Sequence, residues 1–195
     1  VKRRKMSLQE LSIRGAYVSR HKVFPDERGL FREWFKAEEM SSIDKDFSVQ
    51  QANYSKSKKS VIRGIHYSIA PQGQSKVVTC VSGSITDTLV DLRVGSPTYL
   101  KVEQILLTED SGDVVYIPTG VGHGFIVESE SASVAYLTSS TYAPEYEKAI
   151  CPTDPALGIT WPIQPGELGI ISQTDTSAPT LAQAAASGDL PIYQI

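Results

Sequence analysis

The chain has 195 residues, of which 41% are hydrophobic and 21% charged, and its formal net charge at pH 7 is −3. This is an ordinary globular composition, and the length favours one domain with a sizeable core. The chain has no excess of basic residues, so its charge does not indicate a nucleic acid or an acidic membrane surface as a partner. No apolar run approaches the ~20 residues of a membrane span.

The N-terminal residues VKRRK are basic, but no apolar segment follows them, so we expect no signal peptide. Residues 1–5 could precede a natural start at Met6, or they could be a frayed terminus. The two cysteines, Cys80 and Cys151, do not make a disulfide framework in a chain of this size. We therefore expect a cytoplasmic protein.

Short strands separated by turn residues dominate the predicted elements. In chain order the strands are expected at 16–24, 30–35, 48–55, 62–67, 76–82, 85–93, 102–107, 114–117, 124–128 and 133–139. Strands at intervals of roughly 8–12 residues predict a sandwich or barrel, whereas βαβ units would need helical patterns between the strands. The chain is therefore expected to be all-β.

Few helices are expected. Residues 36–43 could form two turns, and residues 144–150 could form one or two with glutamates in the first turn. The Ala-rich segment 179–187 has a proline near its start and Gly188 just past its end, which predicts a C-terminal helix.

The stretch 62–76 combines three basic residues: Arg63, His66 and Lys76. A strand, a turn at 71–73 and a second strand would bring His66 and Lys76 close together. His66 can accept a proton near neutral pH, and Lys76 can stabilise a developing negative charge. Arg63 and His66 have opposite parity in a strand, so either a bulge lies between them or Arg63 serves another surface.

Strand alternation also places charged groups among apolar ones. Lys76 shares a face with two apolar residues of its strand, which makes it a candidate for a partly buried amine. Asp87 and Asp91 share a face with Ile85 and Leu89. A carboxylate buried on such a face needs a partner.

His123 lies between two glycines, in what we expect to be a Gly-rich turn between strands, where a backbone can approach a ligand closely. A packed histidine bonded to a backbone carbonyl is the alternative. His21 has no comparable neighbours and is interpreted as structural.

Other chemistries lack their motifs. The chain contains no His-x-His, His-Glu-x-x-His or Cys-x-x-Cys metal pattern, no G-x-S-x-G elbow and no phosphate-loop or dinucleotide fingerprint. A metal held by His66, His123 and a carboxylate stays a minor alternative.

Proton transfer without a metal needs a base, an acid on the opposite side of the substrate and a cation for the intermediate. Tyr136, on a predicted core strand, is a candidate acid, although it could equally be an amphipathic core residue. Tyr142, in the loop that follows, could stack on a flat ring or simply pack on the surface.

Several segments together resemble the dTDP-4-dehydrorhamnose 3,5-epimerase family of nucleotide-sugar epimerases. They are FPDERGLFREWF, QQANYSKS, VIRGIHY, PQGQSKVV, SITDTLVDLRVGSPT, YIPTGVGHGF, VAYLTSSTYAPEYE, DPALGITWP and SQTDTSAP, and they run from about Phe24 to Pro179. The resemblance implies an all-β fold, a double-stranded β-helix jelly roll of the cupin type with a few short helices, formed by residues 1–195 as a single domain.

The resemblance also implies site residues. By matching motifs, His66 is the expected base, Asp175 its carboxylate partner, Lys76 the cation for the enolate and Tyr136 the acid. Further substrate contacts are expected at Arg28, Phe31, Glu33, Gln51, Asn53, Arg63, His123, Tyr142 and Glu147. No metal and no cofactor are expected.

The implied substrate is dTDP-4-keto-6-deoxy-D-glucose, inverted at C3, C5 or both, and the implied assembly is a homodimer with exchange of N-terminal strands. The alternatives are a mono-epimerase, an isomerase that moves the ketone, a non-catalytic nucleotide-sugar-binding module and a metal-dependent oxygenase. Two positions depart from the family pattern: Thr174 replaces a lysine of the SxKD motif, and Ser68 stands where glutamine is common.

Overall fold

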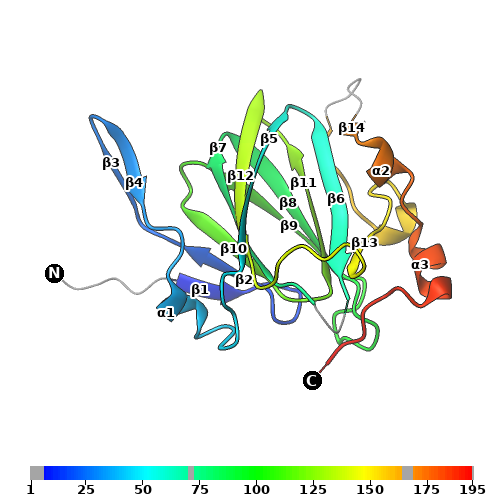
Figure 1. Ribbon diagram of the computed structural model, residues 1–195. Helices are drawn as coiled ribbons and strands as arrows, with labels where there is room; N and C mark the ends of the chain where they lie inside the picture. The colour runs from blue at the N-terminus through cyan, green and yellow to red at the C-terminus, as the bar shows by residue number, and fades with distance from the viewer. Residues whose placement is uncertain (1–6, 70–72, 164–168, 195) are drawn as a thin grey trace.

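The computed structural model describes residues 7–69, 73–163 and 169–194 and forms a jelly roll of two facing, mainly antiparallel sheets (Figure 1). The first sheet has the order β1 (Ser7–Glu10), β2 (Tyr17–Arg20), β10 (Asp113–Ile117), β7 (Lys76–Ser82), β12 (Ser131–Thr138), β5 (Gln51–Lys58). The second has the order β13 (Glu147–Ala149), β6 (Val61–Ser68), β11 (Val121–Val127), β8 (Ser84–Asp91), β9 (Val102–Thr108), with β14 (Ile170–Ile171) parallel to β6. The expectation of an all-β jelly roll is confirmed.

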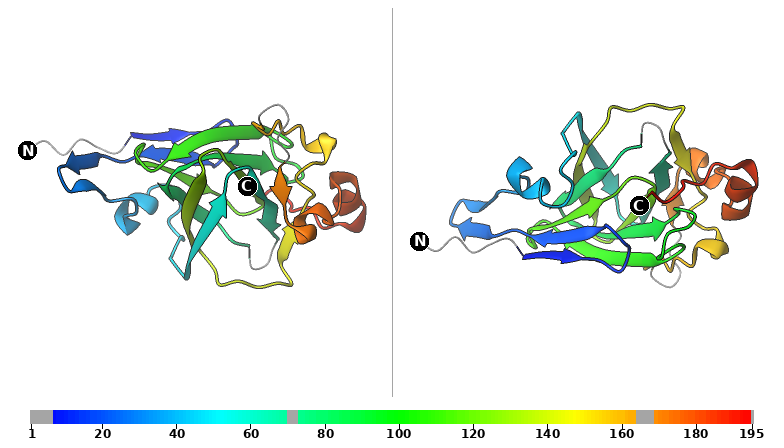
Figure 2. Two further views of the ribbon diagram at one scale, coloured as in Figure 1. Left: turned by 90° about the horizontal axis from the view of Figure 1, so that it is seen from above. Right: turned by 90° about the horizontal axis from the view of Figure 1, so that it is seen from below.

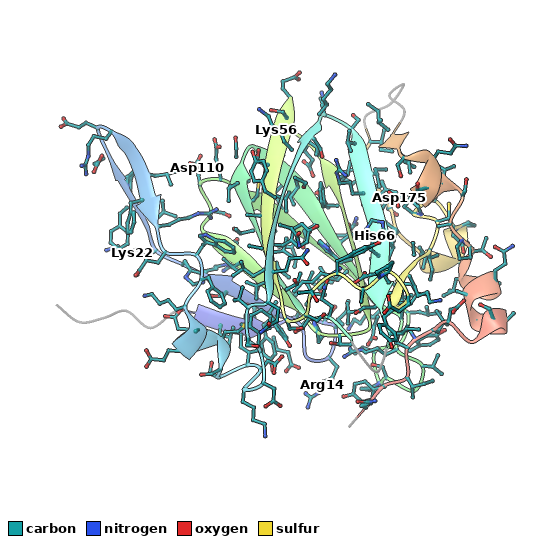
Figure 3. All side chains as sticks on the ribbon, in the orientation of Figure 1. Arg14, Lys22, Lys56, His66, Asp110 and Asp175 are labelled. Atoms are coloured by element: carbon teal, nitrogen blue, oxygen red, sulfur yellow. The ribbon has the colours of Figure 1, made fainter. Side chains whose placement is uncertain are left out.

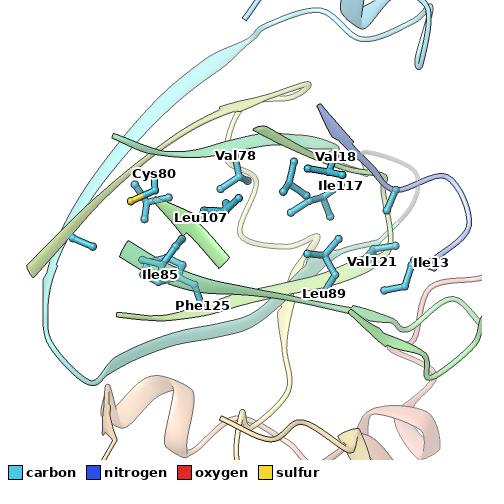
Figure 4. Packing of buried hydrophobic residues seen from close by; sticks show 14 of the residues in the cluster. Ile13, Val18, Val78, Cys80, Ile85, Leu89, Leu107, Ile117, Val121 and Phe125 are labelled. Carbon is cyan, nitrogen blue, oxygen red and sulfur yellow. The ribbon is translucent and has the colours of Figure 1, made fainter. Parts of the chain in front are cut away.

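The main core lies between the two sheets (Figure 4). Val78 and Cys80 of β7 point into it from the first sheet, and Ile85, Leu89 and Phe125 point into it from the second. These residues alternate along their strands with outward-facing ones, as a pleated sheet with one buried face requires. The face that carries Lys76 and the face that carries Asp87 are therefore the inner faces of the sandwich.

The outer face of each sheet is covered by a different part of the chain (Figure 2). Beyond the second sheet, Tyr67 and Leu92 pack against the C-terminal region, which contains η1 (Pro155–Leu157), α2 (Gln173–Thr176) and α3 (Leu181–Ser187). Beyond the first sheet, Val77 and Tyr116 pack under the segment that contains α1 (Ala37–Met40). The predicted C-terminal helix is confirmed as α3, with Gly188 as its left-handed C-cap.

A two-stranded arm extends from the sandwich, made of β3 (Val23–Asp26) and β4 (Gly29–Arg32) (Figure 1). The side chains of Phe24, Leu30 and Phe31 are exposed on it. At its base, the Arg32 guanidinium donates hydrogen bonds to the Cys80 carbonyl at 2.5 Å and to Thr79 Oγ1 at 3.2 Å, so the arm is anchored to β7 of its own chain.

Three expectations about elements are wrong. The single strand expected at 16–24 is two strands, β2 and β3, because the chain leaves the first sheet after Arg20 and enters the arm. The helix expected at 144–150 is the strand β13, because its backbone pairs with the open edge of β6. The Gly-rich turn expected around His123 lies within β11, which pairs with β6 and β8 along this stretch.

Residues 71 and 72 of the turn expected at 71–73 lie outside the described residues, and residues 1–5 lie entirely outside them. In the described part of the chain, no helix is long and apolar enough to cross a membrane.

Candidate active site

A histidine–carboxylate pair lies on the inner face of the second sheet. His66 Nε2, on β6, is 2.7 Å from Oδ1 of Asp175, on α2 (Figure 3). The His66 side chain is 45% exposed, whereas that of Asp175 is 8% exposed. Since an ionised carboxylate only accepts hydrogen bonds, Nε2 carries the shared hydrogen, and Nδ1 of the neutral ring keeps a lone pair for a proton.

The short helix α2 holds this carboxylate in place. Ser172 is its N-cap, and the Ser172 hydroxyl accepts a hydrogen bond from the Asp175 backbone N–H at 3.0 Å. Asp175 therefore sits in the first helical turn, where a negative charge is favoured. The adjacent Thr174, which replaces the lysine of the family pattern, is exposed.

A bulge in β6 brings Arg63 to the same face as His66. Across the ladder, His66 pairs with His123 and Arg63 pairs with Phe125, so three steps on β6 oppose two on β11. Because of the extra residue in β6, the side chains of Arg63 and His66 lie on the same face of the sheet, whereas in a regular strand they would lie on opposite faces. Arg63 Nε donates to Ser57 Oγ of β5 at 2.9 Å, which joins the two sheets.

The inner face of the first sheet contributes a second set of polar side chains. Tyr136 of β12 pairs with Val78 of β7 and Asn53 of β5, and Thr138 pairs with Lys76 and Gln51. Lys76, Tyr136, Asn53 and Gln51 therefore share one face near one end of this sheet. The candidate amine and the candidate phenol belong to one sheet, and the candidate base belongs to the other.

Burial changes the acid–base properties of Lys76 and Tyr136 in opposite directions. The Lys76 side chain is buried, which lowers the pKa of its amine, and the charge of Glu147 opposes this shift. Burial also raises the pKa of the Tyr136 phenol, with Arg63 opposing the shift and Glu147 adding to it. The phenol therefore keeps its proton at neutral pH, as a proton donor must.

Glu147 is the acidic neighbour of both groups. It begins β13 and pairs with Ser68 at the end of β6. Ser68, at the position where glutamine is common in the family pattern, is buried and accepts a hydrogen bond from the Gln74 backbone N–H at 2.7 Å. This bond ties the end of β6 to the segment that leads into Lys76.

A polar link connects Gln51 to Tyr142. The Gln51 amide donates to Asn53 Oδ1 at 2.8 Å and accepts from the Tyr142 backbone N–H at 2.9 Å. The Tyr142 ring itself is 65% exposed. Gln51 thus fixes the backbone of the loop that presents this ring.

His123 is paired with a carboxylate as well. Its Nε2 is 2.7 Å from Oδ1 of Asp87, and Asp87 is fully buried. Strand alternation had indicated that a buried Asp87 would need a partner, but nothing in the sequence showed that His123 is that partner. Ser57, the partner of Arg63, was not anticipated either, because a lone serine in a strand carries no signal of its own.

The three remaining predicted site residues lie on or beside the arm, away from His66. Arg28 is exposed and pairs with Asp26 at 2.5 Å, and Glu33 pairs with Lys36 at 2.8 Å. Phe31 lies beside Phe24, with ring centroids 6.3 Å apart and ring planes tilted by 43°. One chain does not bring these residues to the histidine site (Figure 1).

No three His, Cys, Asp or Glu side chains come together as a potential metal site in the described parts of the chain.

Comparison with known proteins gives one family. The family model described as dTDP-4-dehydrorhamnose 3,5-epimerase matches residues 10–183. A dTDP-4-dehydrorhamnose 3,5-epimerase of Mycobacterium tuberculosis is 39% identical over 194 residues, covering 97% of this chain and 94% of that protein.

Solved structures agree with this match. A 4-keto-6-deoxy sugar epimerase from the novobiocin biosynthetic gene cluster of Streptomyces spheroides superposes with a TM-score of 0.92 and 40% identity, covering 97% of this chain and 94% of that one. A 3'-monoepimerase of Streptomyces bikiniensis, in complex with dTDP-quinovose, has a TM-score of 0.88 and 39% identity, covering 94% and 92%.

Proposed function

The chain belongs to the dTDP-4-dehydrorhamnose 3,5-epimerase family, and from this premise we propose how its residues act on a sugar nucleotide. The enzyme is a dTDP-sugar epimerase of deoxysugar biosynthesis, and hence an isomerase. The substrate proposed for it is dTDP-4-keto-6-deoxy-D-glucose, in which C3 is adjacent to the C4 ketone and C5 lies on its other side.

The proposed reaction is proton removal and return through an enolate. His66, oriented by Asp175, takes the proton from a carbon beside the ketone, and the electron pair moves onto the ketone oxygen. Lys76 stabilises the negative charge on that oxygen. Tyr136 then donates its proton to the opposite face of the carbon, which inverts the centre.

One observation carries this proposal: the His66–Asp175 pair, at 2.7 Å, lies on one sheet and the Lys76 and Tyr136 side chains lie on the inner face of the other. A substrate bound between them would have a base on one side and a proton donor on the other. That arrangement is what inversion by a two-face mechanism requires.

The nucleotide end of the substrate is assigned to other residues. Arg63 and Arg28 are proposed to contact the diphosphate, since guanidinium groups bind phosphate oxygens bidentately. Tyr142 is proposed to stack on thymine, and Gln51, Asn53, His123 and Glu147 to contact the remaining polar groups.

We also propose a homodimer in which each arm reaches the partner's site. The proposal is supported by the exposed apolar side chains of the arm and by the distance of Arg28, Phe31 and Glu33 from His66 within one chain. Exchange of the arms would bring these three residues to a nucleotide bound on the partner.

Incubation with dTDP-4-keto-6-deoxy-D-glucose in deuterated water, followed by NMR, tests the function. We expect deuterium to enter at C3, C5 or both, with inversion at the same carbons. A substrate that gains no deuterium at either carbon would contradict the proposed activity.

Inversion at a single carbon is the second candidate. It is favoured by a specific comparison: a dTDP-4-dehydro-6-deoxyglucose 3-epimerase of a Streptomyces species is 40% identical over 190 residues, as similar to this chain as the 3,5-epimerases are. The same NMR experiment separates the two, because a 3-epimerase would label C3 and leave C5 unlabelled.

Two broader proposals accompany this function. We propose that the chain folds as one domain. The proposal is supported by two ladders that join distant parts of the chain: β2, near the N-terminus, pairs with β10, and β14, near the C-terminus, pairs with β6. We also propose a cytoplasmic location, supported by two cysteines that are both free thiols.

A further inference from the structure

Asp87 is a fully buried carboxylate that the reaction described above does not use. It lies on β8 between Ile85 and Leu89, which both belong to the apolar core, and it pairs across the ladder with Phe125. A side chain at this position would normally be apolar, because an ion in such surroundings loses its hydration.

His123 is the hydrogen-bond partner that the structure gives this carboxylate. Oδ1 is 2.7 Å from His123 Nε2, and Oδ2 is buried with no partner among the described residues. Because the carboxylate only accepts, Nε2 of His123 must carry a hydrogen. With its hydrogen on Nε2, the neutral ring keeps a lone pair on Nδ1, which can accept a hydrogen bond.

His123 stands directly beside His66. The two residues pair with each other across the antiparallel ladder of β11 and β6, which places their Cα atoms roughly 4.5–5.5 Å apart. The two rings are tied in different directions, His66 to α2 and His123 to β8. The site therefore contains two neighbouring imidazoles, each with its own carboxylate, and only the His66 ring is substantially exposed.

We propose that Asp87 is a positioning residue: by fixing the hydrogen of His123 on Nε2, it holds Nδ1 as a hydrogen-bond acceptor for a sugar hydroxyl next to the carbon that His66 deprotonates. The inference rests on the proposed epimerase function. His66 and His123 would then have different roles, with His66 taking the proton from carbon and His123 orienting the sugar through its hydroxyl group. Asp87 acts only through His123 and does not touch the substrate.

The test is Asp87→Asn, which keeps the shape of the side chain but removes its charge. We expect the rate of deuterium uptake at saturating substrate to fall by on the order of 10- to 100-fold, by analogy with the loss of a carboxylate that orients a metal-ligating histidine. The dissociation constant for dTDP, measured by calorimetry, should stay within about twofold of wild type, because the sugar and not the nucleotide contacts His123. Asp113→Asn is the matched control. Ile117, at one end of β10, pairs with Lys76, whereas Asp113 is at the other end of this strand and away from the site. This variant should therefore keep the wild-type rate of deuterium uptake.

A double-mutant cycle distinguishes positioning from a structural role. His123→Asn combined with Asp87→Asn should be no slower than His123→Asn alone, because the carboxylate acts through that ring. Equal uptake rates in Asp87→Asn and wild type, additive losses in the double variant, or equal losses of dTDP binding and uptake would each overturn the proposal. If Asp87→Asn does not fold, Asp87→Leu with His123→Phe replaces the pair by apolar residues, and uptake by this variant at the wild-type rate would also overturn it. Absence of uptake in the wild type would instead contradict the proposed function.

Discussion

Lys76 and Tyr136 share one sheet face, and their protonation states are set by the same burial. Burial destabilises the charged form of each group, the ammonium of Lys76 and the phenolate of Tyr136. The pKa of Lys76 is therefore lowered, and the pKa of Tyr136 is raised. In the proposed reaction both residues act in their protonated forms. The amine is thus the group that limits activity as the pH rises.

This difference predicts the origin of the alkaline limb of the pH–rate profile. Since the pKa of Lys76 is lowered, its ammonium form is lost at a lower pH than that of a free lysine, while Tyr136 still holds its proton. Lys76→Arg replaces the amine by a group that stays charged, so the alkaline limb of kcat/KM should move to higher pH even though the rate itself falls. Profiles of wild type and variant from pH 6 to about 11 measure this.

Lys101→Arg provides the control, because Lys101 is exposed and outside the site. Its profile should coincide with that of the wild type. An alkaline limb that stays in place in Lys76→Arg would assign it to another group and remove Lys76 from its proposed role.

At the scale of elements, the site depends on the bulge in β6. Gly64 lies inside the bulge with φ +119°, and an added Cβ would lie 2.5 Å from the Gly124 Cα on β11. Both the backbone angle and the close approach require glycine. The two strands can therefore pack closely enough to put Arg63 and His66 on the same face.

Gly64→Ala should destabilise the protein and reduce activity together. We expect a loss of about 3 kcal/mol in the free energy of unfolding, combining a strained backbone angle with displacement of a neighbouring strand. Denaturant unfolding measures it. Gly95→Ala is the matched control, since Gly95 has φ +87° with open space around its Cβ position, and it should lose only about 1 kcal/mol and keep its activity. Equal losses in the two variants would show that the close strand packing contributes nothing.

Much of this element structure could be predicted from the sequence. Strand alternation placed Lys76 with the core and indicated that a buried Asp87 needs a partner. Opposite parity left two alternatives, a bulge between Arg63 and His66 or a different surface for Arg63, and the pairing with β11 shows the bulge. These patterns are local, so they can be read from a single strand. The strand β13 was predicted as a helix because its pairing with β6 depends on an edge contributed by residues about eighty positions earlier.

The hydrogen-bond partners of the site residues were harder to predict from the sequence than the strands were. The hydrogen bond between His123 and Asp87 joins β11 to β8, and the sequence pattern does not determine that these two strands are neighbours in the sheet. The pairing of His66 with Asp175 was expected only from the resemblance to a family, because the four-residue helix that holds Asp175 has no periodicity that would predict it.

At the scale of the whole molecule, the arm separates one group of predicted site residues from the other. Arg28 lies on the arm, whereas His66 lies in the sandwich, and the arm is anchored at its base by Arg32 (Figure 1). A monomer would have an incomplete nucleotide site. The proposed exchange of arms makes activity a property of the dimer.

Complementation between inactive variants tests the exchange. Arg28→Ala and His66→Asn, co-expressed with different tags and purified as a mixed dimer, should regain activity, because one of the two sites then receives an intact arm and an intact histidine. Because one of the two sites in each mixed dimer is intact, the recovered activity should be about half of wild type.

The control pairs two variants of the sandwich, His66→Asn and Tyr136→Phe. Both residues come from the same chain in each site, so every site in this mixture keeps one defect and no recovery is expected. Failure of the first mixture to regain activity, or light scattering that gives a monomer, would contradict arm exchange.

The central claim is that a base on one sheet and a proton donor on the other act on opposite faces of the same carbon. NMR in deuterated water can follow isotope uptake and inversion together in wild type, His66→Asn and Tyr136→Phe. We predict that His66→Asn takes up no deuterium, and that Tyr136→Phe still takes it up while inversion slows by about 100-fold or more, since His66 can return a deuteron to the face it came from. Uptake at the wild-type rate in His66→Asn, or inversion at the wild-type rate in Tyr136→Phe, would contradict the account.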